Sequence, residues 1–321
     1  MRVNLSPTHK RTRRSRVFSA SFSAKMPSRS LGEKIFNVFN LILLSGFALL
    51  CLYPFVYILA LSFNEGRDAV RGGVFLFPRV FSLENYTAVF TDSRIVSSFL
   101  ISVFRTVMGA FLGVLVNALF AFALSKRDLP LRKFLNWFIV IPMYFGAGII
   151  PYYLICRALG LINNIWVYVL PWLSMPFYIM LMRISILDLP PSLEESAKMD
   201  GAGYIRIFGQ IVLPLIMPSI ATVALLGGIF HWNDWLDGTI LTSRSDMWPL
   251  QTLLLNILQG ADMANLLRSR ATYNGIFRRV SVTPESLKMA MLVITVLPVF
   301  LVYPFAQKYF IRGMMVGSIK E

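Results

Sequence analysis

Long apolar runs, separated by short polar segments, are the dominant pattern of the chain. Six of these runs reach the length of about 20 residues that an α-helix needs to cross the hydrocarbon core of a bilayer. They cover residues 35–61, 105–124, 134–155, 165–182, 215–235 and 287–310. Several runs contain prolines, which bilayer helices tolerate when neighbouring groups bond the freed carbonyls. The pattern predicts an all-α integral membrane protein with six kinked transmembrane helices.

One charged side chain, Arg105, falls at the edge of the second run. Counting back about 20 residues from Leu124 places Arg105 at the outer end of that helix. A guanidinium in this position can snorkel to the water interface along its apolar stem. We therefore expect an interfacial arginine rather than a buried functional charge.

Basic residues in the short connections predict the sidedness of the spans, because Lys and Arg beside a span are retained in the cytoplasm. Besides the N-terminal segment, they lie between the second and third runs and after the sixth: Lys126, Arg127, Arg132, Lys133, Lys308, Arg312 and Lys320. Both termini are therefore predicted to be cytoplasmic, with segments 62–94, 156–164 and 236–286 outside. For 62–94 we expect a packed loop with a short strand at the alternating residues 74–77.

The composition agrees with a membrane location. Hydrophobic residues make up 56% of the 321 residues and charged residues only 15%, whereas soluble domains carry roughly 25% charged residues. A soluble globular protein is excluded. Residues 1–34 contain nine Lys or Arg and one acid, within a net charge of +15. Because this leader precedes an apolar run, an orientation signal is favoured over anionic-lipid contact, and neither nucleic-acid binding nor a cleaved signal peptide is expected.

The residues needed for most enzyme chemistry are scarce. Cys51 and Cys156 are the only cysteines and His9 and His231 the only histidines, so neither a disulfide framework nor a metal site is supported. The phosphate-binding pattern Gly-x-x-x-x-Gly-Lys-Ser/Thr is also missing from the sequence. We therefore expect no catalytic residues, no metal and no ATPase site in this chain.

The segment between the fourth and fifth runs, 190–214, has well-defined helix signals. Two prolines precede Ser192, which can cap a helix over 193–200 with Glu195 completing a capping box. Gly201 and Gly203 permit a turn, and an amphipathic helix resumes at 204–213. In this second helix we expect four apolar side chains to lie on one side, namely Ile205, Phe208, Ile211 and Val212. The segment is predicted to be a helix-turn-helix at the inner membrane surface, where an interfacial connector is the simpler alternative.

The same segment carries a family pattern. Glu195-Ser196-Ala197, then Gly201, then Ile211-x-Leu213-Pro214 resembles the EAA loop of permease subunits in binding-protein-dependent ATP-binding-cassette (ABC) importers, with Ser196 in place of the usual Ala. The resemblance implies a type I ABC importer permease fold in which this loop is a coupling helix that docks into an ATPase subunit. The coupling residues that it implies are Glu194, Glu195, Ser196, Ala197, Asp200 and Gly201.

The resemblance covers roughly 90–315. Segments 303–310 and 313–320 look like the carbohydrate branch of the family, and 231–238 looks like permeases for complex oligosaccharides, including uronate-containing polysaccharides. This implies a bacterial inner-membrane protein that works with a second permease, two ATPase subunits using ATP and Mg, and an extracytoplasmic binding protein that delivers a saccharide. The expected regions are a basic leader (1–34), a first transmembrane helix (35–61), an external loop (62–94), a permease core (95–310) with coupling loop 190–214 and external loop 236–286, and a cytoplasmic tail (311–321).

The end of the fifth run combines aromatic, amide and carboxylate groups. Aromatic rings can stack on sugar CH faces, while Asn and Asp can bond hydroxyls. An interfacial aromatic belt, with the carboxylates solvated or capping, remains open as the alternative. The proposed substrate-path residues are Trp232, Asn233, Asp234, Trp235 and Asp237.

Four arginines without an acid lie within 268–279 of the last external segment: Arg268, Arg270, Arg278 and Arg279. Basic residues outside run against the usual bias, so we expect them to meet an acidic binding protein or an anionic sugar, with lipid head groups as the alternative. An ion-coupled secondary transporter is the alternative function. It normally carries ionisable residues deep in its spans, and those are almost absent from these runs.

Overall fold

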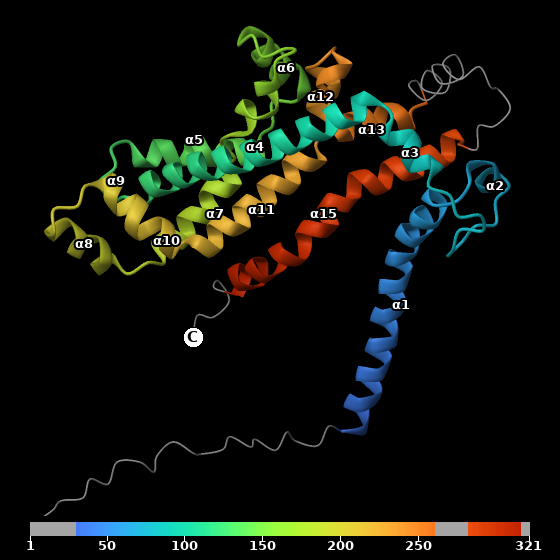
Figure 1. The fold of residues 1–321 in the computed structure, drawn as a ribbon. Coiled ribbons are helices and arrows are strands. Elements are labelled where there is room, and N and C mark those ends of the chain that lie inside the picture. The colour runs from blue at the N-terminus through green and yellow to red at the C-terminus, as the bar shows by residue number, and fades with distance from the viewer. Residues whose placement is uncertain (1–29, 261–281, 316–321) are drawn as a thin grey trace, which may run out of the picture. The chain divides into compact units, whose positions relative to one another are not determined.

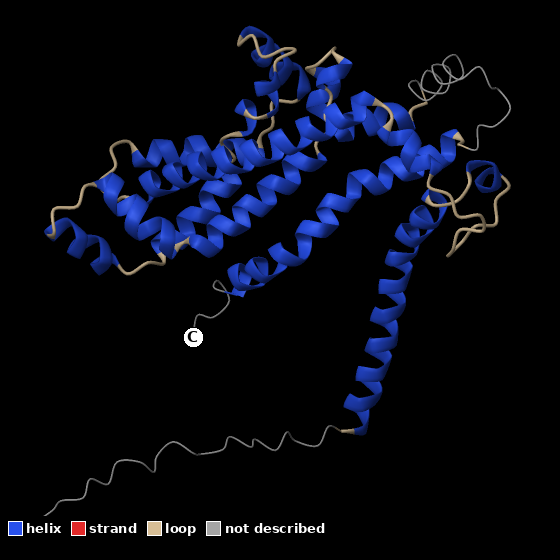
Figure 2. Cartoon of the chain, viewed as in Figure 1, coloured by secondary structure: helices blue, strands red, loops and turns tan. Residues whose placement is uncertain are grey.

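The computed structural model describes residues 30–260 and 282–315, with side chains up to Pro304 in the second range. These parts are helical, without a strand, as Figure 2 shows. The chain divides into two units at Tyr53, inside helix α1 (Leu31–Ser62). No α1 side chain before Ala60 is buried, and most of them are apolar. Such an exposed apolar helix is what a bilayer requires.

The second unit is organised around α4 (Ser93–Ser125). This helix packs against α7 (Pro176–Leu187) and α11 (Met217–Asn233), and α11 packs in turn on α15 (Pro284–Met315) (Figure 1). The contact between α4 and α11 depends on Gly109, where an added Cβ would lie 2.3 Å from the imidazole of His231. Only glycine lets the two helices approach this closely at that level.

The predicted spans correspond to three long helices and several broken ones. α1, α4 and the Pro284–Pro304 part of α15 are each long and apolar enough to cross a membrane. Two further helix pairs pass the same test together but are bent, by 48° between Ile165–Trp172 and Pro176–Leu187 and by 81° between Tyr204–Leu215 and Met217–Ile240, so each is a broken span or a re-entrant loop. Prolines at the breaks account for the bends, because they lack the N–H that continues a helix.

The third predicted span, 134–155, is not one helix. It divides into α5 (Arg132–Tyr144) and α6 (Ile149–Ala158) around Gly148, whose φ is +81°. By length and composition the described residues thus supply between three and five spans, and a sixth requires α5 and α6 to cross together.

The remaining helices are short. The bent pairs contain the 3₁₀ turns η1 (Ile165–Tyr168) and η2 (Leu170–Trp172), then α9 (Tyr204–Ile207), the π-helical turn η3 (Phe208–Val212), α10 (Leu213–Leu215) and α12 (Leu236–Ile240). The connections contain α2 (Gly66–Val70), α3 (Glu84–Phe90), α8 (Pro191–Met199), η4 (Ser245–Met247) and α13 (Leu250–Leu258).

Segment 62–94 is packed, as predicted, but the strand at 74–77 is wrong. α2 and α3 both contact α15. Val74 is buried against Ala60 and Leu61, whereas residues 75–77 form an exposed bend. Gly72 and Gly73, both with positive φ, turn the chain just before it, so these residues have no neighbouring strand with which to pair.

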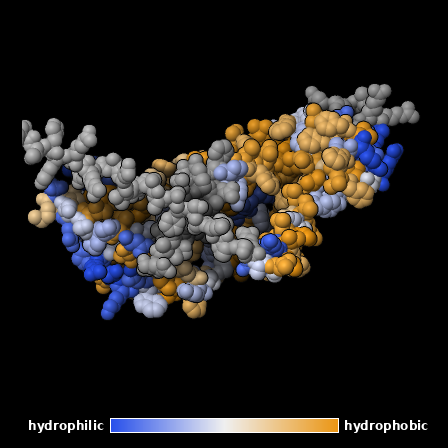
Figure 3. Space-filling model, turned by 90° about the horizontal axis from the view of Figure 1, so that it is seen from below, coloured by the Kyte–Doolittle hydropathy of each residue, from blue (hydrophilic) through white to orange (hydrophobic). Residues whose placement is uncertain are grey.

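Apolar residues cover much of the described surface that Figure 3 shows. Exposed apolar side chains include Phe111, Trp137 and Phe138, each about two-thirds exposed. A surface of this kind is stable only against lipid or another protein chain.

Candidate functional site

Helix α8 forms at the position of the predicted coupling loop, but its start differs from the prediction. Pro191 is its first residue, Pro190 is the cap, and no side chain caps the helix. The predicted capping box between Ser192 and Glu195 is therefore wrong. Pro191 sets the start because its fixed φ suits the first helical position, where an N–H is not needed.

The turn after α8 agrees with the prediction. Gly201 has a φ of +79°, and its N–H donates to the carbonyl of Lys198 over 3.0 Å. The N–H of Ala202 donates to the carbonyl of Ala197 over 2.9 Å, which completes a Schellman motif. No atom lies within 4 Å of a Cβ built at Gly201, so a side chain there meets backbone strain rather than a clash.

The second helix of the loop is present, but one predicted inward residue is wrong. Ile207, Phe208 and Val212 are buried against α4 and α7, whereas Ile205 is 89% exposed. The π turn widens the spacing, so residues five apart share the inner side. A regular 3.6-residue period assigns Ile205 to the wrong side.

The six predicted coupling residues divide into two groups. Ala197 is buried, and Glu194 is partly buried. The other four are exposed, namely Glu195, Ser196, Asp200 and Gly201. The first group holds α8 on the spans, and the second remains open to another protein.

Lys126 ties α8 to the end of α4. Its Nζ donates to Glu194 Oε2, and Lys198 Nζ lies 3.0 Å from Glu194 Oε1. Burial opposes ionisation of Glu194, but the hydrogen bonds from Lys126 and Lys198 outweigh it and hold the pKa of this carboxyl below its usual value. In the sequence Lys126 signals only orientation, because its partner lies 68 positions away.

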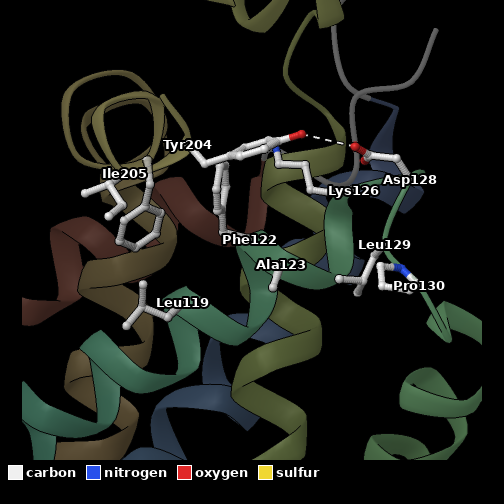
Figure 4. A pocket seen from close by; sticks show the side chains of 10 residues that line it. Leu119, Phe122, Ala123, Lys126, Asp128, Leu129, Pro130, Tyr204 and Ile205 are labelled. Atoms are coloured by element: carbon white, nitrogen blue, oxygen red, sulfur yellow. Dashed lines mark hydrogen bonds between the residues drawn. The ribbon is translucent and has the colours of Figure 1, made fainter. Parts of the chain in front are cut away.

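A cavity of about 450 Å³ opens beside this contact (Figure 4). Phe122 and Phe208 line its apolar part, and Lys126 lies 3.9 Å from the centre of the Phe122 ring. At its rim the Tyr204 hydroxyl donates to Asp128 Oδ2 over 3.1 Å. Residues 126–130 and 190–215 thus form one connected unit, called the coupling end below after the role predicted for this loop.

Arg105 corrects the sequence interpretation. Its side chain is fully buried, with Nη2 2.5 Å from Asp234 Oδ2 and Nη1 2.9 Å from the Asp234 carbonyl. The snorkelling prediction is wrong because α4 starts at Ser93, twelve residues before Arg105. Arg105 therefore lies about 18 Å inside the helix, at a rise of about 1.5 Å per residue.

Asp237 is also buried, and two aromatic side chains hold it. It accepts from the Tyr152 hydroxyl over 2.9 Å and from Trp172 Nε1 over 2.7 Å. The buried polar network, defined as Arg105, Asp234, Asp237, Tyr152 and Trp172, thus joins α4, α6, η2 and α12 to the end of α11. Tyr152 and Trp172 carry no sequence signal, because a single aromatic residue in an apolar run reads as packing.

The proposed substrate-path residues do not share one surface. Trp232 is buried, and its Nε1 donates to the Thr295 carbonyl over 3.0 Å. Asp234 Oδ1 accepts from the N–H of Leu236, the first residue of α12, over 3.0 Å. Asn233 and Trp235 are exposed. Four further candidates lie outside the described residues, namely Arg268, Arg270, Arg278 and Arg279.

No group of three His, Cys, Asp or Glu side chains within the described residues could hold a metal ion. Arg105 and Asp237, the buried charged side chains of the polar network, bind other groups of the chain instead.

A helix-turn-helix of this kind, presented beside several broken spans, matches a known family. Residues 17–316 match the family model of the binding-protein-dependent transport system inner membrane component. The chain belongs to this family. It is a permease subunit, the inner-membrane component of an ABC transporter that works with a binding protein, and the ATPase is a separate subunit. Membership overturns the ion-coupled alternative.

Two further comparisons agree. The polygalacturonan/rhamnogalacturonan transport system permease protein YtcP of Bacillus subtilis (strain 168) is 36% identical over 277 residues, 85% of this chain and 94% of the relative. A crystal structure of a bacterial ABC transporter involved in the import of the acidic polysaccharide alginate matches with a TM-score of 0.81 and 32% identity, over 88% of this chain and 99% of that chain. The permease therefore has the type I permease-like fold.

A second structure supports the fold alone. It is the alginate ABC transporter in complex with an alginate pentasaccharide-bound periplasmic protein, with a TM-score of 0.56 and 14% identity over 85% of this chain and 93% of that chain.

Proposed function

We propose that this permease moves an anionic oligo- or polysaccharide from an extracytoplasmic binding protein into the cytoplasm. The similarity to an alginate importer and to a polygalacturonan/rhamnogalacturonan permease supports this class, because both named substrates are acidic. The exposed residues of α8 support a role of this helix in coupling ATP hydrolysis to transport.

The proposed assembly contains a second permease subunit and two ATPase subunits that bind ATP and Mg. The four exposed residues of α8 and its turn contact the ATPase, and the contact between Lys126 and Glu194 transmits its movement to α4. Lipid or the second permease covers the exposed apolar side chains of α1.

The proposed topology has six spans with both termini in the cytoplasm. α5 and α6 together make the sixth span, and the break at Gly148 interrupts it as prolines interrupt the two bent pairs. This places the coupling end in the cytoplasm and the buried polar network toward the outside.

The proposed sugar contacts are Asn233 and Trp235, which are exposed at the end of α11. Trp235 can stack on a sugar ring, and Asn233 can bond a hydroxyl. We further propose that the four arginines of 268–279 face the acidic binding protein or the sugar carboxylates.

Substrate-stimulated ATPase activity of the reconstituted importer tests the substrate class. The complete assembly is reconstituted in proteoliposomes with the binding protein and the sugar inside and the ATPase subunits facing the outer solution, where ATP is added. Oligouronates should stimulate ATP hydrolysis, whereas neutral oligosaccharides of the same length should stimulate it little. Equal stimulation by the neutral set would contradict the anionic assignment while leaving the permease assignment intact.

A further inference from the structure

Two arginines lie close together on neighbouring helices beside the coupling end. Arg132 is the first residue of α5, and Arg183 lies four residues before the end of α7. The two helices contact each other, and the positive charges of these side chains repel one another. At a rise of about 1.5 Å per residue, both lie within about 6 Å of the helix ends.

Three polar atoms of this cluster lack a hydrogen-bond partner. Nε of Arg132, Nε of Arg183 and Oδ1 of Asn136 are all buried. Arg132 and Asn136 are four residues apart on α5 and so share one face. Arg183 Nη1 has a weak contact to Met180 Sδ at 3.9 Å. Buried polar groups are normally satisfied, so the cluster is incomplete in the isolated chain.

No acidic side chain within the described residues forms an ion pair with either arginine. The nearby Lys126, by contrast, is paired with Glu194. Two adjacent guanidinium groups that have no carboxylate partner favour the binding of an oxyanion. Each planar guanidinium can bind such an anion through two parallel N–H donors. An amide side chain can rotate to present its NH₂ group to the same anion.

The surroundings indicate which oxyanion binds. No α5 residue is buried as a whole, and Phe134, Trp137 and Phe138 are about two-thirds exposed on it. Basic groups between helix ends on the cytoplasmic side, beside an apolar surface, suit a lipid that carries a phosphate and acyl chains. A soluble anion makes no use of the apolar surface.

We propose that Arg132, Asn136 and Arg183 bind the phosphate of an anionic phospholipid in the cytoplasmic leaflet. The lipid neutralises the repulsion between the arginines and holds α5 against α7. The location in this leaflet rests on the topology given under the proposed function.

The test uses the complete importer, purified in detergent and stripped of lipid. Phosphatidylglycerol is added to one sample, phosphatidylcholine to a second and inorganic phosphate to a third, and thermal unfolding and lipid retention by native mass spectrometry are measured. Only phosphatidylglycerol should raise the Tm and remain bound. Equal effects of phosphatidylcholine or of inorganic phosphate would overturn the proposal.

Matched variants locate the site. R132Q/R183Q should abolish the difference between the two lipids, whereas R127Q/K133Q, which removes the same charge from exposed positions nearby, should preserve it. R132K/R183K keeps the charge but loses the forks, so we expect lipid affinity to fall about tenfold in a variant that retains the fold. An unchanged lipid preference in both variants of Arg132 and Arg183 would overturn the site.

A third result separates the lipid from the substrate. If an oligouronate stabilises the importer through Arg132 and Arg183 and phosphatidylglycerol does not, the cluster belongs to the sugar path and the lipid proposal is wrong. Sugar uptake by the unmodified importer is measured in parallel, so loss of the lipid effect in a working importer refutes this proposal alone.

Discussion

The coupling end and the buried polar network are both built from charged and aromatic side chains, but they differ in how those side chains are used. At the coupling end, Glu195, Ser196 and Asp200 are exposed on a helix that a few contacts hold in place. In the network, Arg105 and Asp237 are completely buried, and Asp234, Tyr152 and Trp172 of the same chain bind them. The first arrangement leaves groups open for another protein, and the second fixes helices relative to one another.

The largest expected effect on stability is at the network. Arg105→Met leaves the Asp234 carboxylate without its partner, and breaking a buried pair from one side costs about 3–5 kcal/mol. The double variant R105M/D234N removes both charges and should recover part of that loss. Thermal unfolding of the purified importer measures both.

The exposed Arg157 provides the control for this comparison, since R157Q should change stability by no more than about 0.5 kcal/mol. If R105M and R105M/D234N unfold at the same temperature as the unmodified protein, the ion pair does not hold the network together.

These two regions also differ in what the sequence could predict. Gly201, the prolines and the EAA-like spacing act over short distances along the chain, so α8 and its turn could be placed in advance. Arg105 and Asp234 are separated by 129 positions, so a single sequence contains no sign of their pairing. Periodicity identified the apolar runs, but it failed at η3, where the π turn changes the period, and at 134–155, where Gly148 breaks the helix.

A smaller effect is expected from the contact between Lys126 and Glu194. Because both side chains are partly exposed, E194Q should change stability by at most about 1 kcal/mol, which is up to about fivefold in any equilibrium that the contact controls. E195Q is the matched variant, since Glu195 is exposed on the same helix. We expect E194Q to alter the unfolding temperature and E195Q to alter only ATPase stimulation.

The contact between Lys126 and Glu194 should also depend on pH in one direction. Because the pKa of Glu194 is lowered in the folded protein, its stabilisation is fully present above the usual carboxyl pKa of 4.5 and is lost as the pH falls through the lower folded value. The stability difference between the unmodified protein and E194Q should therefore be constant near neutral pH and vanish in acid. A difference that grows on acidification would contradict the assigned ion pair.

Energy coupling through Gly201 is the central claim, and ATPase-driven uptake by two glycine variants tests it most directly. G201L forces a β-carbon into a positive φ and adds bulk at the exposed turn, while G209L adds the same bulk at an exposed glycine of the same loop without a positive φ. Uptake and substrate-stimulated ATPase activity should be lost in G201L and retained in G209L, with both assembled importers eluting normally on size exclusion. Normal uptake and stimulation by G201L would contradict the assignment of residues 190–214 as the coupling loop.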